Sequence, residues 1–152
     1  MEIISFEPKY AKDFRNLNIE WLEKYFWVEP HDEEVLGKPE KYIIEPGGNI
    51  FFVREHDKII GTVALMKIEE GIFELTKMAV VPAAQGKKIG QKLMVHSIDF
   101  AKSRGWKKLI IWSNRKLENA IYIYRKYGFT EIPIEGENPY ARGDIKMELP
   151  LS

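Results

Sequence analysis

The chain has 152 residues, with 23 basic and 23 acidic side chains, 45% hydrophobic residues and no cysteine. Because the net charge is zero, no positive field draws the protein to nucleic acid or to an anionic membrane, so any anion must be bound locally. The lack of cysteine excludes disulfides, thiolate nucleophiles and zinc–thiolate sites, and the three scattered histidines predict no metal site. This length predicts a single domain over residues 1–152 with a buried core.

Location is predicted from what the sequence lacks. No apolar segment reaches the roughly 18 residues of a membrane span. The first residues, MEIISFEPKYAKDF, show no basic region followed by an apolar one, so we expect no signal peptide. Cytoplasmic residence is the default expectation.

The first third of the chain predicts one strand followed by helices. Residues 2–7 form a strand candidate, and Pro8 then opens a segment whose apolar residues recur at helical spacing through residues 14–25. Two short helices are expected around residues 32–36 and 39–44, in a stretch marked by prolines and a glycine pair.

The middle of the chain predicts an antiparallel meander. Residues 49–81 contain three strand-like runs, and the turn signals at residues 56–58 and 69–71 separate them. A helix is expected over residues 87–103, followed by a buried strand at 107–113.

The last third predicts a helix at residues 117–127 that ends at Gly128, and then two terminal strands at 129–133 and 144–149. The full order of elements predicts an α/β fold. Its sheet is expected to be mixed but mostly antiparallel, with about seven strands flanked by about four helices.

The segment VVPAAQGKKIGQKL, residues 80–93, has the features of an anion site. A strand leads through a turn into a helix whose first N–H groups lack intrahelical partners, and glycine allows a bulky anion to approach the backbone. Neither a Walker A loop nor a dinucleotide fingerprint is present. An equally good reading makes Gly86 a turn residue and Gly90 a helix-packing residue.

A second constellation follows in SNRKLENAIYIYRKYGF, where Asn114, Ala120, Ile121 and Tyr124 precede Gly128-Phe129. Together with ELTKMAVVPAAQGKKIGQKL, this pattern resembles the GCN5-related N-acetyltransferases over essentially the whole chain. The segments EWLEKYF and YARGDIKMEL also look like those of small bacterial members of the family.

The family signature Q/R-x-x-G-x-G/A is matched by Gln85 and Gly90, whereas Lys88 replaces the first motif glycine. We expect Lys88 to keep ordinary helical dihedrals, so that its amide still faces a pyrophosphate.

The resemblance implies an acetyl-CoA-dependent enzyme that acetylates a primary amine of a small molecule, amino acid or peptide in a ternary complex. Such a reaction needs a base for the amine and an acid for the departing thiolate. Glu74 is the base candidate, although a solvated or lysine-paired carboxylate is nearly as good a reading. Tyr124 is the acid candidate, because its pKa near 10 exceeds that of a thiol at roughly 8.5. Tyr122 and Tyr127 flank it as decoys.

The CoA site implied by the resemblance is mostly backbone. The strand through Met78, Ala79 and Val80 is expected to splay at a bulge and pair with the pantetheine arm, with a backbone N–H polarising the thioester carbonyl. The other candidates surround the pyrophosphate or reach the pantetheine: Gln85, Gly86, Lys87, Lys88, Ile89, Gly90, Gln91, Asn114 and Asn119.

The acceptor site is the least specified. The candidates are Trp21, Tyr25, His31, Tyr140 and Arg142, which suit an aromatic-walled pocket for an amine. Trp21 can equally be a core residue, and the His31-Asp32 pair reads better as a helix cap than as a base.

Two other functions stay open, a catalytically silent acyl-CoA-binding sensor and a nucleotide-binding module unrelated to CoA. Self-association as a homodimer is compatible with surface aromatics and an edge strand, but no spacing requires it.

Overall fold

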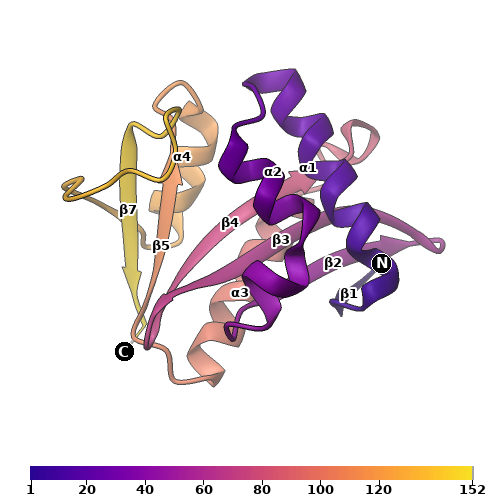
Figure 1. The fold of residues 1–152 in the computed structure, drawn as a ribbon, viewed down its shortest axis with the longest axis horizontal. Coiled ribbons are helices and arrows are strands. Elements are labelled where there is room, and N and C mark those ends of the chain that lie inside the picture. The colour runs from indigo at the N-terminus through magenta and orange to yellow at the C-terminus, as the bar shows by residue number, and fades with distance from the viewer. Residues whose placement is uncertain (152) are drawn as a thin grey trace.

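The computed structural model describes residues 1–151 and arranges them around one seven-stranded sheet of order β1-β2-β3-β4-β5-β7-β6 (Figure 1). Only β4 and β5 pair in parallel, and all other neighbours in this sheet are antiparallel. The predicted fold class is therefore confirmed. The strands are β1 Glu2–Ser5, β2 Asn49–Glu55, β3 Lys58–Glu69, β4 Ile72–Val80, β5 Lys108–Ser113, β6 Thr130–Ile132 and β7 Ile145–Pro150.

Helices cover both faces of the sheet. The α-helices in the described residues are α1 Ala11–Tyr25, α2 Pro30–Gly37, α3 Ile89–Ser103 and α4 Glu118–Lys126, and the short segments are η1 Pro8–Tyr10, η2 Glu40–Ile44 and η3 Pro82–Ala84. Figure 1 shows α1 and α2 in front of the sheet and α3 behind it. None of the helices in residues 1–151 is long and apolar enough to cross a membrane.

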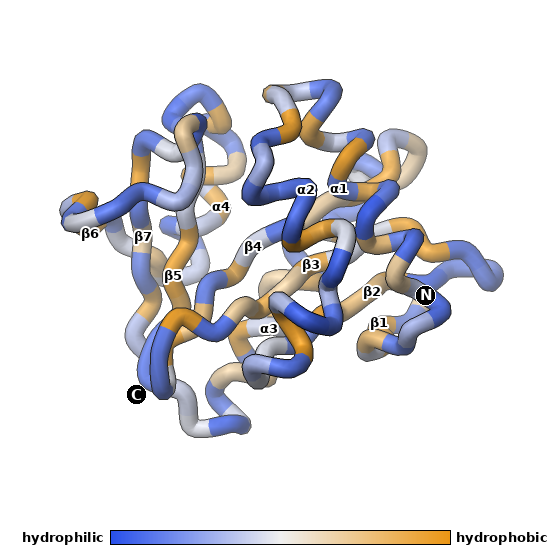
Figure 2. Tube along the Cα trace, viewed as in Figure 1, coloured by the Kyte–Doolittle hydropathy of each residue, from blue (hydrophilic) through white to orange (hydrophobic). Residues whose placement is uncertain are grey.

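The alternation of side chains along β2 explains the two-layered core. Ile50 and Phe52 pack into the cluster beneath α1, α2 and η2, whereas Phe51 and Val53 pack into the cluster beneath α3. Successive residues of a strand point to opposite faces, so a strand covered on both faces reads as one apolar run. Figure 2 shows this concentration of hydrophobic residues on the central strands.

A bulge interrupts β4 where it passes β3. Thr62 pairs with Ala79 and Ala64 pairs with Thr76, so two residues of β4, Lys77 and Met78, face the single residue between them on β3. Lys77 takes a left-handed conformation with φ +55°, which is the conformation that glycine has in one class of β-bulge.

Beyond its first three residues, β4 also separates from β5. The two strands pair only where residues 72–74 meet residues 108–110, and Figure 1 shows them diverging from that end. The β5-facing edge of β4 from residue 75 onward therefore has no strand partner. This is the splay expected at Met78, Ala79 and Val80.

Candidate active site

A cavity of about 460 Å³ lies in the gap between the splayed strands. Its walls come from residues 75–80 of β4, the end of β5, the C-terminal half of α1 and the start of α4. Parallel strands that separate leave backbone N–H and C=O groups free, so this cavity offers an extended amide-rich ligand the hydrogen bonds of a missing strand.

Tyr124 lies on the α4 wall of this cavity. Burial raises the pKa of the Tyr124 phenol above 10, and the neighbouring Ser113 opposes this rise in part. The phenol is therefore protonated at neutral pH. This is the protonation state that a donor to a leaving thiolate requires.

Glu74 lies behind the cavity wall rather than on it. Its side chain is buried, and its Oε2 accepts a hydrogen bond from the Tyr140 hydroxyl at 2.9 Å. Burial raises the pKa of the Glu74 carboxyl above 4.5, and the positive charge of Lys77 counteracts part of that rise. Tyr140 itself lines the cavity. The carboxylate is thus joined to the cavity through a phenol.

Lys77 completes a chain of hydrogen bonds to Glu74. Its Nζ donates to the Tyr140 oxygen at 3.3 Å and to Asp32 Oδ1 at 3.1 Å. Burial lowers the pKa of Lys77, and the charges of Asp32 and Glu74 oppose this shift. Burial also raises the pKa of Tyr140 well above 10, and the Glu74 charge adds to that rise. Tyr140 therefore acts as a neutral link, not as a base.

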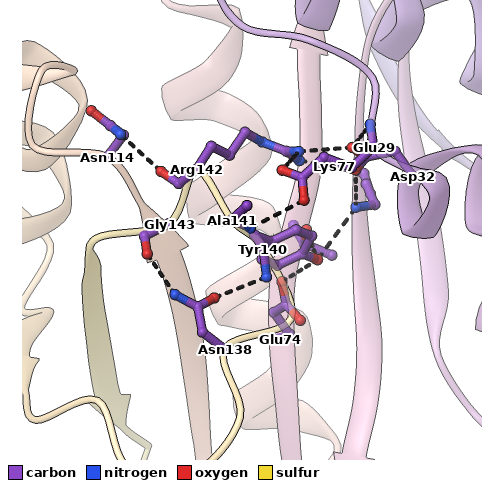
Figure 3. A network of polar contacts seen from close by, with 11 residues as sticks. Glu29, Asp32, Glu74, Lys77, Asn114, Asn138, Tyr140, Ala141, Arg142 and Gly143 are labelled. Atoms are coloured by element: carbon purple, nitrogen blue, oxygen red, sulfur yellow. Dashed lines mark hydrogen bonds and ion pairs between the residues drawn. The ribbon is translucent and has the colours of Figure 1, made fainter.

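Asp32 is the most strongly bound carboxylate of the network in Figure 3. Its side chain is fully buried, and it accepts hydrogen bonds from Lys77, from both terminal nitrogens of Arg142 and from the Glu29 backbone. Burial alone would raise the pKa of Asp32. The hydrogen bonds from Arg142 and the charge of Lys77 outweigh that effect and lower it to about 2.

The net charge of this cluster depends on whether Glu74 is ionised. The cations Lys77 and Arg142 stand against the carboxylates of Asp32, Glu29 and Glu74. With Glu74 protonated the charges balance, and with Glu74 ionised one negative charge is in excess. Because buried charges are stable only when compensated, an ammonium group that enters the cavity would supply the missing positive charge.

In the candidate phosphate loop, the predicted backbone conformation of Lys88 is wrong. Lys88 does not keep helical dihedrals, because it precedes α3 in the left-handed conformation with φ +59°. That conformation is one that glycine adopts without strain and a lysine does not. It gives a physical reason for the glycine of the family signature. Helix α3 consequently begins at Ile89.

The N–H groups of Ile89, Gly90 and Gln91 lie in the first turn of α3, where helices have no internal partners for them. The neighbouring side chains are partly engaged. Lys87 forms an ion pair with Glu55 at 3.6 Å. The Gln91 side chain accepts a hydrogen bond from Tyr127 at 3.0 Å, so Gln91 has a structural contact in addition to its candidate role.

A second depression of about 630 Å³ lies on the α3 side of the sheet. Its wall includes Lys88, Gln91, Lys92, Lys126 and Tyr127. Three lysines gathered around one hollow make it suited to phosphate groups. Gly86 is exposed at the loop that leads into this region, with φ +91°.

The remaining cofactor candidates line the first cavity. Met78, Ala79, Val80, Gln85 and Asn119 all contribute to its wall, as does Asn114. The Asn114 side chain donates to the Arg142 carbonyl at 2.8 Å and accepts from the Lys116 N–H at 2.9 Å. It therefore fixes the loop that carries Arg142, whichever ligand it also contacts.

The acceptor candidates separate into two groups. Trp21, Tyr25, Tyr140 and Arg142 line the cavity, so Trp21 is not simply a core residue. His31 lies outside the wall and packs edge-on against the Tyr140 ring. The helix cap that was expected of the pair is made by Asp32, whose carboxylate accepts the Glu29 N–H at 3.0 Å.

Lys77 is the main residue that the sequence did not reveal. A single lysine stands in the otherwise apolar end of FELTKMAVV. Such a residue is the available signal for a buried polar site, because unpaired lysine is rarely buried. The Glu29 and Asp32 partners of Arg142 lie more than a hundred residues away along the chain, beyond the reach of local patterns.

Comparison with known proteins settles the family. Residues 6–129 match the model of the acetyltransferase (GNAT) family. The chain belongs to the GNAT family of N-acetyltransferases. Two relatives are both described as uncharacterised N-acetyltransferases. YjgM of Escherichia coli is 29% identical over 91 residues, which span 58% of this chain and 54% of that protein. C1271.07c of Schizosaccharomyces pombe is 26% identical over 150 residues, or 95% and 91% of the two chains.

Solved structures agree on the fold. A GNAT-family acetyltransferase from Staphylococcus aureus Mu50 superposes with a TM-score of 0.86 at 21% identity, covering 99% of each chain. The Vibrio cholerae spermidine N-acetyltransferase, solved with CoA and spermine, gives a TM-score of 0.76 at 20% identity, covering 99% of this chain and 95% of that one. The family match identifies a GNAT acetyltransferase domain, and these structures share its fold.

Proposed function

We propose that this GNAT protein transfers the acetyl group of acetyl-CoA to a primary amine by direct attack in a ternary complex. The observation that carries the proposal is the cavity at the splay of β4 and β5. It has Tyr124 on one wall, and the Tyr140–Glu74 pair reaches it from another. The two halves of the reaction, deprotonation of an amine and protonation of a thiolate, thus have separate groups that face one cavity.

The donor is held mainly by backbone in this proposal. The unpaired edge of β4 at Met78, Ala79 and Val80 pairs with the amides of the pantetheine arm. The first-turn N–H groups of α3 receive the pyrophosphate. The lysines around the second depression, among them Lys88, bind the remaining phosphate of CoA. An N–H of Met78 or Val80 polarises the thioester carbonyl.

Proton transfer starts from the ammonium form of the acceptor. The amine gives its proton to the Tyr140 oxygen as the Tyr140 hydroxyl proton passes to Glu74, which neutralises the excess negative charge of the buried cluster. The free nitrogen then attacks the thioester carbonyl, so a C–N bond forms and the C–S bond breaks. The departing thiolate takes the proton of Tyr124, and the second proton that the acylated nitrogen loses as it becomes an amide restores the Tyr124 phenol.

Two measurements test the proposal. CoA and acetyl-CoA should raise the melting temperature of the protein more than ATP or NAD, and acetyl-CoA with a panel of primary amines should release free thiol. Thermal stabilisation without turnover on any amine would instead indicate a silent acyl-CoA-binding protein. No stabilisation by CoA would contradict the assignment of the cavity.

A further inference from the structure

We propose that the acceptor is an amine that also carries a carboxylate, namely a free α-amino acid with an apolar or aromatic side chain. This proposal rests on the proposed acetyl transfer and specifies its substrate class. The carboxylate binds the guanidinium of Arg142, and the amine lies beside the Tyr140 hydroxyl.

Only some of the N–H donors of the Arg142 guanidinium form hydrogen bonds within the protein. Nη1 donates to Glu29 Oε2 at 2.7 Å and to Asp32 Oδ2 at 2.7 Å, and Nη2 donates to Asp32 Oδ1 at 2.9 Å. A guanidinium has five N–H donors in a planar fork. Among residues 1–151, the Nε–H and the second Nη2–H find no acceptor. These two donors share one edge of the guanidinium and point the same way, which is the geometry that pairs with both oxygens of a carboxylate.

The free edge of Arg142 is held in place before any ligand arrives. The Asn114 side chain binds the Arg142 carbonyl at 2.8 Å, and the guanidinium carbon lies 5.0 Å from the centre of the Tyr140 ring. Only 14% of the Arg142 side chain is exposed, and the residue lines the cavity. A donor pair that is already ordered binds its partner with little further loss of conformational entropy.

The carboxylate is what distinguishes an α-amino acid from a polyamine at this wall. Within residues 1–151 the wall includes Lys77 and Arg142 but no aspartate or glutamate, and both cations are paired with the carboxylates of Asp32 and Glu29. The ammonium group of either ligand offsets the excess charge of an ionised Glu74. Only the α-amino acid also brings a carboxylate for the free donors of Arg142, which a polyamine leaves without an acceptor.

The rest of the acceptor wall is aromatic. Trp21 lies 5.2 Å from Tyr25 and 5.7 Å from Phe26 between ring centres, and all three line the cavity. Aromatic walls of this kind bury an apolar or aromatic side chain with favourable ring contacts. The amino acid therefore places its carboxylate on Arg142 and its side chain on these rings.

Matched acceptors test the proposal on the unmodified protein. L-phenylalanine, L-phenylalaninamide and 2-phenylethylamine share a primary amine and an aromatic ring, and only the first has a carboxylate. Loss of a charged, bidentate contact of roughly 1.5–3 kcal/mol predicts a kcat/KM about 10- to 100-fold higher for L-phenylalanine than for the other two. Equal or better acetylation of 2-phenylethylamine, or a preference for spermidine, would overturn it.

The variant Arg142→Lys keeps the positive charge but removes the planar pair of N–H donors that would bind both carboxylate oxygens. We expect the preference for L-phenylalanine over 2-phenylethylamine to fall about 10-fold or more. Arg115→Lys is the matched control, because Arg115 is exposed and pairs with Glu131 outside the cavity wall. It should keep the wild-type preference. An unchanged preference in a folded Arg142→Lys protein would contradict the assignment of the carboxylate site.

A binding measurement separates this proposal from the proposed reaction. Calorimetric titration of the CoA-loaded protein with L-phenylalanine and with 2-phenylethylamine detects the Arg142 contact without turnover. Tighter binding of L-phenylalanine supports the carboxylate site even if no thiol is released. Turnover of amines without any gain from the carboxylate would leave the acetyltransferase proposal standing and refute the acceptor class.

Discussion

Asp32→Asn should be among the most destabilising conservative changes in this chain. The fully buried Asp32 carboxylate lies 3.1 Å from Lys77 Nζ and 2.7 and 2.9 Å from the two terminal nitrogens of Arg142. Asparagine keeps the shape but leaves the buried Lys77 without its counter-charge. Removal of one partner of a buried ion pair costs about 3–5 kcal/mol.

The lowered pKa of Asp32 also indicates how much stability the ionised carboxylate contributes, and how that contribution depends on pH. The difference between the ordinary value of 3.8 and about 2 in the folded protein corresponds to on the order of 2 kcal/mol of stabilisation. Because the folded value lies below the unfolded one, this stabilisation is fully present above pH 3.8. It is lost as the pH falls through about 2. The Asn variant lacks this component at every pH.

Urea unfolding followed by tryptophan fluorescence measures the effect. At neutral pH the free energy of unfolding should fall by about 3–5 kcal/mol in Asp32→Asn, and the gap between the two proteins should narrow as the pH falls from 4 towards 2. Asp99→Asn, at an exposed position of α3, is the control and should change stability by less than about 0.5 kcal/mol. Adding Lys77→Met to Asp32→Asn should restore part of the loss. A loss below about 1 kcal/mol would refute the reasoning.

Three other predictions concern the proposed chemistry. Tyr124→Phe should lower kcat for thiol release by roughly 100-fold or more with little change in the KM of the amine, and a change below threefold would remove Tyr124 from the acid role. Glu74→Gln should lower kcat/KM and abolish its fall at acid pH, because the raised pKa places that fall above 4.5 in the native protein; an unchanged acid limb would argue against Glu74. Lys88→Gly relieves a left-handed lysine, so the melting temperature should hold or rise, while CoA titrations at low salt should show weaker binding.

The order of the elements could be predicted from the sequence because the signals are local. Turn residues separate the strands of the meander, and Gly128 ends α4 with φ +101° as the C-terminal glycine of a helix often does. The cavity residues on β4 and α4 were also found, since the family motifs lie on those segments, and Trp21 and Tyr25 of α1 were among the acceptor candidates.

The polar network could not be predicted, because long-range pairing creates it. Arg142 and Asp32 are 110 residues apart in the chain, and the local sequence around each residue does not predict that they pair. The conformation of Lys88 was also missed, because a lysine does not itself mark a left-handed backbone, although the family signature has glycine at this position. That conformation is visible only once the loop between η3 and α3 is in place.

The bulge in β4 links the two halves of the proposed site. In an unbroken strand Lys77 would share the face of Phe73 and Leu75, where its amine would lie in the apolar core beneath α3. The left-handed conformation of Lys77, which costs roughly 1–2 kcal/mol, instead carries the amine to the face of Glu74 and Tyr140. Its pairing with Asp32 stabilises that arrangement. The bulge lies within the part of β4 that has no β5 partner, which begins at residue 75. The cation that orders the proton path and the free backbone proposed to hold the donor therefore come from the same stretch of one strand.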